Sequence, residues 1–235
     1  MKGKYRYEQK YIIKKAQYLE LRQILSAMME QDDHVGDSGD YMIRSLYFDD
    51  MYRSAYKEKL DGVYVRKKYR VRVYNCEDRV IHLECKHKQG AYIFKESAPL
   101  TREEYDNILK GELGFLLKRK EPVAREFFVD ARSSLIHPEV IVDYEREPYV
   151  YDAGTVRITF DKEVRAGSPE DSLFDSQIPT YGVLRPDEMI LEIKFTGYLP
   201  ERIRRLFYVE NYTQTSASKY CLCVDKIREF RYSGI

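Results

Sequence analysis

Hydrophobic and charged residues alternate in several segments of the chain, and this period of two predicts β-strands whose two faces differ in character. The alternation is clearest in Tyr5–Ile13, Lys68–Tyr74, Ile81–Lys88, Val156–Asp161 and Met189–Phe195. In the second of these segments, Lys68, Arg70 and Arg72 share one face, whereas the other face carries only apolar or aromatic residues. We therefore expect a sheet that is apolar on one side and mostly cationic on the other.

A period of three to four residues predicts helices in the remaining parts of the chain. We expect them over Lys14–Glu30, Arg102–Leu109, Glu121–Ile136, Pro200–Tyr208 and Lys219–Phe230. Start signals support three of them, because Thr101 and Glu104 form a capping box, Pro200 stands in a first turn, and Ser216 and Ser218 precede the last helix. The segments Val35–Asp40 and Ala166–Tyr181 are rich in Ser, Asp, Gly or Pro and are expected to be loops.

Two arrangements explain a cationic sheet face. In the first, the charged face is simply solvated, which is the usual explanation for any single strand of this kind. In the second, the sheet closes on itself, with its apolar face outward under helices and its charged face inward around a wet tunnel. Neighbouring Arg and Lys side chains repel one another unless anions or acids lie among them. Repetition over several strands therefore favours the closed sheet.

Composition agrees with one domain spanning residues 1–235. Hydrophobic residues make up 43% of the chain, enough for a core, and charged residues 34%, against roughly 25% in an average globular protein. The formal net charge is only +1, so an electrostatic function depends on how the charges are sorted in space. Tyr is the commonest aromatic residue, with 22 copies against 10 Phe and no Trp, and it suits half-buried strand faces.

Several classes of protein are not indicated. No segment approaches the roughly 18 apolar residues of a membrane span, and the charged start of the chain is unlike a secretory leader, so we expect a cytoplasmic protein. The cysteines and histidines form no CxxC pair and no zinc motif, and we expect reduced thiols. These residues are Cys76, Cys85, Cys221, Cys223, His34, His82, His87 and His137. A P-loop and a kinase glycine-rich loop are also absent, so a nucleotide would be held through its phosphates.

A series of short motifs runs along nearly the whole chain. They are Arg6–Ile12, Ile43–Asp50, Lys68–Tyr74, Leu83–Lys88, Val142–Arg146, Val156–Asp161, Ile190–Phe195 and Ser218–Tyr220. In sequence and in order, these motifs resemble the VTC domain, the polyphosphate polymerase domain. The family belongs to the triphosphate tunnel metalloenzymes of the CYTH-like superfamily. The resemblance thus implies an α+β fold with an eight-stranded antiparallel β-barrel, a charged interior that binds triphosphate, and covering helices.

The resemblance also implies roles for individual residues. The catalytic cations that clamp the phosphate chain would be Lys10, Arg70, Arg72, Arg146, Arg157 and Lys219. Further phosphate contacts would come from Lys59, Lys86, Lys88, Lys194, Tyr144 and Ser218. Arg suits this task because its planar fork donates two hydrogen bonds to neighbouring phosphate oxygens. Glu192, with help from Glu8, would hold Mn²⁺ or Mg²⁺, because such hard cations prefer oxygen ligands.

The first strand departs from the pattern of the tunnel triphosphatases. Those enzymes resemble this chain there but begin with E-x-E-x-K, whereas this chain has Arg6, Glu8 and Lys10 at the same spacing. Replacing the first carboxylate by Arg weakens a water-activating metal site and adds a phosphate contact. The implied function is therefore a phosphotransferase that moves the terminal phosphoryl of ATP onto a phosphate or polyphosphate chain. Triphosphate and inorganic polyphosphate are the other expected ligands.

Two other functions remain open, a metal-dependent hydrolase of triphosphate or nucleotides and a non-catalytic polyanion binder. No nucleic acid is expected, because Tyr and cations take opposite faces of most strands, whereas single-strand binding needs them together. Each proposed residue also has a simpler explanation. Arg146 and Arg157 could pair with Asp143 and Asp161 on a surface, and Glu192 could form an ordinary ion pair with the neighbouring Lys194. Lys219 could be an exposed helix residue, and Glu8 a counterion to Lys10.

Overall fold

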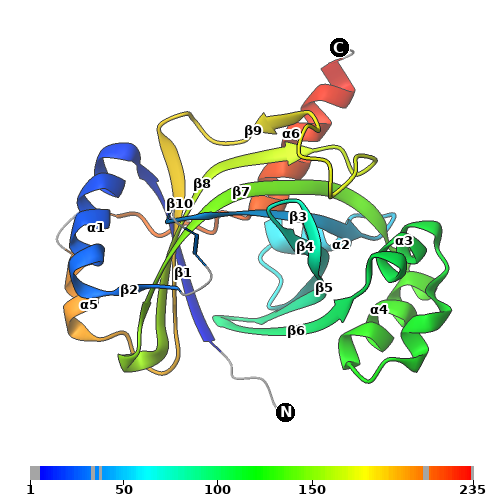
Figure 1. Cartoon of the computed structure of the whole chain (residues 1–235), viewed down its shortest axis with the longest axis horizontal. Helices are drawn as coiled ribbons and strands as arrows, with labels where there is room; N and C mark the ends of the chain where they lie inside the picture. The colour runs from blue at the N-terminus through cyan, green and yellow to red at the C-terminus, as the bar shows by residue number, and fades with distance from the viewer. Residues whose placement is uncertain (1–5, 33–34, 37–38, 209–211, 234–235) are drawn as a thin grey trace.

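The computed structural model describes residues 6–32, 35–36, 39–208 and 212–233 and shows a mixed α+β fold (Figure 1). One ten-stranded antiparallel sheet contains every strand of these residues. The strands are β1 (Arg6–Lys14), β2 (Glu30–Gln31), β3 (Tyr41–Asp49), β4 (Val65–Tyr74), β5 (Glu77–Gln89), β6 (Tyr92–Leu100), β7 (His137–Tyr151), β8 (Val156–Gly167), β9 (Thr180–Gly182) and β10 (Glu188–Phe195). The α-helices are α1 (Lys15–Met28), α2 (Ser54–Leu60), α3 (Arg102–Lys110), α4 (Pro122–Ser133), α5 (Glu201–Tyr208) and α6 (Lys219–Ser233).

The sheet closes into a ring. Its order is β7-β3-β4-β5-β6-β1-β10-β8, and β8 pairs back onto β7, so these eight strands form a closed circle. The short strands β2 and β9 add to β7 and β8. The sequence prediction of a mixed fold with a closed antiparallel sheet is confirmed.

Helices cover the outer face of the ring, where the apolar residues of the alternating strands gather. Under α3 and α4, buried residues such as Val71, Leu83 and Phe127 form one core. A second core lies at the other end of the molecule, where Leu21 of α1 and Ile203 of α5 pack on the sheet (Figure 1). Each fully buried side chain of this size contributes about 1.5–3 kcal/mol, so these two cores hold the ring under its helices.

The helix α6 lies on the inner side of the sheet. Val142 shares a strand face with Arg146, and Ile190 with Glu192, yet both apolar residues pack against Tyr220 and its neighbours in α6. Part of the interior of the ring is therefore an apolar core, and the charged interior is confined to the rest. The sequence predicts this helix but not which face of the sheet it covers.

The predicted helices are all present, with small shifts at their ends. The capping box is confirmed, because the Glu104 N–H donates to Thr101 Oγ1 at 3.1 Å and the Thr101 N–H donates to Glu104 Oε2 at 2.9 Å. The fourth helix stops at Ser133, short of Ile136, because Leu135 takes a left-handed φ of 54°. Tyr5 and residues 37–38 of the predicted strand and loop lie outside the described residues.

The predicted loop Ala166–Tyr181 is shorter than expected. The strand β8 continues to Gly167, and β9 begins at Thr180, so strand residues occupy both ends of the predicted segment. No helix in the described part of the chain is long and apolar enough to cross a membrane.

Candidate functional site

The charged inner face of the ring encloses a cavity of about 460 Å³. Among the described residues that line it, eleven are Lys or Arg and only Glu8 and Glu192 are acidic. The cations are Arg6, Lys10, Lys68, Arg70, Arg72, Lys86, Lys95, Arg146, Arg157, Lys194 and Lys219. The strands place ten of these side chains together because each strand contributes every second residue to the interior, and Lys219 comes from the first turn of α6. The near-neutral chain thus sorts its charge so that cations concentrate inside.

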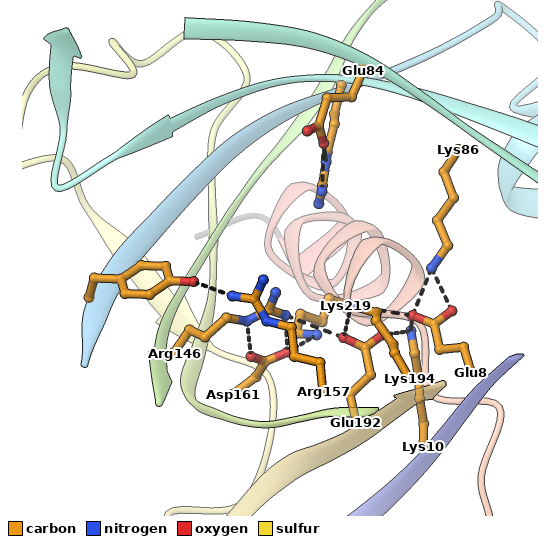
Figure 2. Close-up of polar contacts among 12 residues, drawn as sticks. Glu8, Lys10, Glu84, Lys86, Arg146, Arg157, Asp161, Glu192, Lys194 and Lys219 are labelled. Carbon is orange, nitrogen blue, oxygen red and sulfur yellow. Dashed lines mark hydrogen bonds and ion pairs between the residues drawn. The ribbon is translucent and has the colours of Figure 1, made fainter. Parts of the chain in front are cut away.

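A square of alternating charges lies where β1 pairs with β10 (Figure 2). The register sets Lys10 opposite Glu192, and Glu8 opposite Lys194. Lys10 Nζ lies 3.3 Å from Glu192 Oε1, and Lys194 Nζ lies 2.9 Å from Glu192 Oε2. Glu8 in turn accepts from Lys86 Nζ, at 2.6 Å to its Oε2. Burial would lower the pKa of Lys10, but Glu8 and Glu192 raise it above its usual value.

The Asp161 carboxylate holds two cations in place on the adjacent wall of the cavity. Arg146 donates from Nε and Nη2 to the two Asp161 oxygens at 2.7 and 2.8 Å, and Lys219 forms an ion pair with the same carboxylate. Although burial favours the neutral carboxyl, Arg146 and Lys219 hold the pKa of Asp161 below its usual value. Arg146 also donates to Glu192 at 3.3 Å. The two buried acids therefore fix the cations that converge on this side of the cavity (Figure 2).

Glu84 plays the same part on the opposite wall. It accepts from Arg70 Nε at 2.8 Å, from Arg72 Nη2 at 2.5 Å and from Lys95 Nζ at 2.7 Å. Burial alone would raise the pKa of Glu84, but these three cations lower it. One buried carboxylate against three cations leaves this wall positive overall.

Lys68 has no carboxylate within ion-pair distance among the residues that the structure describes. Its Nζ donates to Ser218 Oγ at 3.2 Å and lies 5.3 Å from the centre of the Tyr220 ring. Burial, together with nearby lysines, lowers the pKa of Lys68 to about 7. Burial likewise lowers the pKa of Lys194 to about 8, although Glu192 opposes the shift. The cavity is thus over-supplied with positive charge, and a bound anion would relieve it.

Buried polar atoms without a partner point to the same conclusion. In the described part of the chain, Arg72 Nε, Arg157 Nε, Ser45 Oγ and Thr159 Oγ1 make no hydrogen bond. The register sets Ser45 beside Arg72, and Thr159 beside Glu192, so all four atoms belong to the inner face. Unpaired buried donors cost about 1–3 kcal/mol each, and a ligand with many acceptor oxygens would recover this cost for the two arginines, which line the cavity.

The paired carboxylates fit a hard divalent cation. The Glu8 and Glu192 side chains are both almost fully buried, and each lies within 3.9 Å of both Lys10 Nζ and Lys194 Nζ. Carboxylate oxygens together with phosphate oxygens are the donor set that Mg²⁺ and Mn²⁺ prefer. Each carboxylate now binds lysine ammonium groups, which a phosphate chain would draw away. These two residues are therefore the ones that could hold a metal in the cavity.

Most of the residues predicted from the sequence line this one cavity. Those that do are Glu8, Lys10, Arg70, Arg72, Lys86, Tyr144, Arg146, Arg157, Glu192, Lys194, Ser218 and Lys219. Lys59 and Lys88 do not line it and belong instead to an adjoining cavity of about 470 Å³.

The structure tests the simpler explanations for Lys219, Arg157 and Arg146, and the result differs for each residue. Lys219 is buried, with 9% of its surface exposed, so the exposed-helix explanation is wrong. Arg157 pairs with Asp32 at 2.8 Å and also donates to the Tyr41 hydroxyl, rather than pairing with Asp143 or Asp161. Arg146 does pair with Asp161, but in the interior rather than on a surface.

Sequence reasoning missed several members of the site. Lys68 stands on the predicted cationic face with Arg70 and Arg72, but the family resemblance assigns it no role in the site. Lys95 lies opposite Lys86 in the register, but its strand shows only weak alternation. The roles of Glu84 and Asp161 as buried counterions depend on contacts that no spacing shows.

A closed antiparallel ring with a cationic, carboxylate-bearing interior is the architecture of the triphosphate tunnel proteins. The chain belongs to the VTC domain family, whose model matches residues 5–228. A search of curated proteins by sequence finds no match.

Solved structures agree on the fold. The chain is similar to a candidate adenylyl cyclase from Hippeastrum described with a dominant triphosphatase activity, at a TM-score of 0.57 and 13% identity, covering 94% of this chain and 95% of that one. It is also similar to a candidate adenylate cyclase from Bacillus halodurans, at a TM-score of 0.53 and 13% identity, covering 98% and 99%. At this level of identity, the likeness supports the fold alone.

Proposed function

We propose that the protein is a polyphosphate-forming phosphotransferase. It moves the terminal phosphoryl of ATP onto a phosphate or polyphosphate chain that lies in the cationic cavity, with Mn²⁺ or Mg²⁺ as the metal. The cavity is suited to this task because phosphoryl transfer needs mainly positioning and neutralisation of negative charge.

The observation that carries this proposal is the adjoining cavity. Its wall shares Glu8, Lys10, Lys68, Lys86 and Ser218 with the main cavity, so the two lie side by side. It adds further cations, which are Lys59, Arg66 and Lys88, and Glu8 is the one acid among its described wall residues. Lys67 also belongs to this wall, but its ammonium group pairs with Glu126 and Asp130 of α4. A triphosphate needs only one such chamber. A basic path through two chambers suits a longer linear polyanion, which is what a polymerase must hold.

The position of each residue in the cavity gives it a role in phosphoryl transfer. Arg146 and Lys219 would bind the phosphoryl group in transfer from one wall, and Arg70 and Arg72 from the other. An oxygen of the acceptor attacks the γ-phosphorus, the bond from that phosphorus to the β–γ bridging oxygen breaks, and ADP leaves with the bonding electrons. A divalent cation at Glu192 and Glu8 would neutralise charge on the phosphate oxygens. Ser218 and the first turn of α6 would donate hydrogen bonds to the chain.

Hydrolysis of triphosphate is the second candidate. It is favoured by the adjacent carboxylates Glu8 and Glu192, which could hold a metal, and by the activity described for the Hippeastrum protein. Arg6 speaks against it, because it lines the cavity where the tunnel triphosphatases carry a second metal-binding Glu. A cation at that position attracts phosphate but activates no water.

The test is to incubate the purified chain with ATP and Mn²⁺ or Mg²⁺, and to resolve products by size while assaying free phosphate. Long phosphate chains would support the proposal, and free phosphate without chains would favour the hydrolase. A protein that binds triphosphate but forms neither product would be a polyanion binder. Glu192→Gln should lose metal-dependent activity, whereas Glu188→Gln should keep it, because Glu188 lies on the same strand but pairs with Arg185 outside the cavity.

A further inference from the structure

A second group of potential metal ligands lies on the outer face of the ring, behind the cationic cavity. Cys85 and His87 are two residues apart on β5, so they project to the same side, whereas Lys86 between them projects into the cavity. The register places Glu96 of β6 opposite Cys85. Glu126 reaches the same spot from α4. Four side chains of three chemical types therefore meet on this outer face.

The distances between the candidate ligand atoms suit a tetrahedrally coordinated metal ion. One ligand atom each from Cys85, His87 and Glu126 lies within 4.8 Å of the others. His87 Nε2 is 3.3 Å from Glu96 Oε2 and 3.5 Å from Glu126 Oε2. Zinc bonds of about 2.0–2.3 Å set tetrahedral ligand atoms roughly 3.3–3.8 Å apart. The distances from His87 to Glu96 and to Glu126 are thus already at this spacing, whereas Cys85 Sγ and the Glu96 carboxylate have to move closer to the other ligands.

The surroundings leave the imidazole available. His87 Nε2 is buried and makes no hydrogen bond within the described residues, although two carboxylates lie beside it. Lys67 donates to Glu126 Oε1 at 2.7 Å and also pairs with Asp130. It therefore holds the carboxylate by the oxygen that faces away from His87. A ligand that is oriented through its second oxygen is typical of protein metal sites.

We propose that Cys85, His87, Glu96 and Glu126 form a zinc site that is separate from the metal position in the cavity. A thiolate and an imidazole select Zn²⁺ over Mg²⁺ or Mn²⁺, which take oxygen ligands. Solvent can deliver the ion, because His87, Glu96 and Glu126 are each 22–31% exposed, with Cys85 beneath them. Four protein ligands make the site structural, and it would tie α4 to β5 and β6.

Cobalt(II) provides the test, because a thiolate bound to Co²⁺ gives a charge-transfer absorption that oxygen ligands do not give. The full chain, stripped of metal with a chelator, should bind one Co²⁺ with this absorption and intense tetrahedral d–d bands, and Zn²⁺ should displace it. Cys85→Ser should abolish the charge-transfer band, and His87→Gln and Glu126→Gln should weaken Zn²⁺ binding at least about 100-fold. The last two residues are partly exposed, so these variants should fold even if the buried Cys85→Ser variant does not.

Two variants serve as controls. Cys76→Ser removes a thiol from the distant turn between β4 and β5, and Glu192→Gln removes the metal candidate of the cavity. Both should keep the cobalt spectrum. Absence of the charge-transfer band in the wild-type chain, or its persistence in Cys85→Ser, would overturn the proposal. A spectrum that is lost with Glu192→Gln would move the metal to the cavity and overturn it as well.

Discussion

Asp161→Asn tests how the cavity balances its charge. The Asp161 carboxylate is fully buried and holds both Arg146 and Lys219. Asn has nearly the same shape but no charge, so two buried cations lose their partner. Breaking a buried ion pair in this way costs about 3–5 kcal/mol. For a domain of this size, that loss lowers Tm by roughly 6–20 °C.

The second part of this prediction concerns the ligand. Tripolyphosphate should take over the role of the missing carboxylate, so it should stabilise Asp161→Asn more than the wild type, by at least about 1.5 kcal/mol. Asp143→Asn is the matched control. Asp143 also holds a buried arginine, Arg44, at 2.7 and 2.8 Å, but on the outer face of the sheet. The Asp143→Asn variant should lose a similar amount of stability, and tripolyphosphate should stabilise it no more than it stabilises the wild type.

Thermal unfolding of the three proteins, with and without saturating tripolyphosphate, measures both effects. A loss below about 1 kcal/mol in Asp161→Asn would refute the reasoning about buried charge. An equal ligand-induced shift in all three proteins would refute the claim that the ligand binds against Arg146 and Lys219.

Three further predictions concern binding. Arg157→Ala or Arg72→Ala should weaken tripolyphosphate binding by about 1.5–3 kcal/mol in calorimetry, and wild-type affinity in either would remove these residues from the site. The double variant Lys59→Ala with Lys88→Ala should weaken long-chain polyphosphate binding but not tripolyphosphate binding, and equal losses for both ligands would contradict two successive chambers. Tripolyphosphate affinity should fall by up to about tenfold per pH unit above pH 7, because the anion favours protonated Lys68. The burial-lowered pKa of Lys68, about 7, leaves its amine increasingly neutral at higher pH. A pH profile that Lys68→Met does not flatten would exclude this lysine as the titrating group.

The two faces of the sheet could be predicted from the sequence because burial imposes a strict period of two. Arg70 and Arg72 line the cavity, and Val71 between them is fully buried in the outer core, as the alternation required. The family resemblance then implied a closed antiparallel sheet of eight strands and singled out many residues of the cavity wall. Local patterns and ordered motifs therefore sufficed for the architecture.

The features that could not be predicted depend on contacts between segments far apart in the sequence. Local periodicity carries no information about such contacts. Nothing in the pattern of α6 distinguishes a helix inside the ring from a covering helix, because both present an apolar stripe. The division of cations between two cavities, with Lys59 and Lys88 in the second, follows from how the strands and the segment before α6 meet. Cys85 and His87 looked unremarkable in the sequence because Glu126 comes from a helix far along the chain.

The central claim is that the cationic interior is a site for a phosphate chain, and calorimetric titration with tripolyphosphate tests it most directly. Citrate serves as a competitor that carries several negative charges but has a different shape. We predict that one tripolyphosphate binds per chain, with an affinity that falls as salt rises and that exceeds the affinity for citrate. Absence of binding, or equal affinity for both anions, would contradict a site built for phosphate.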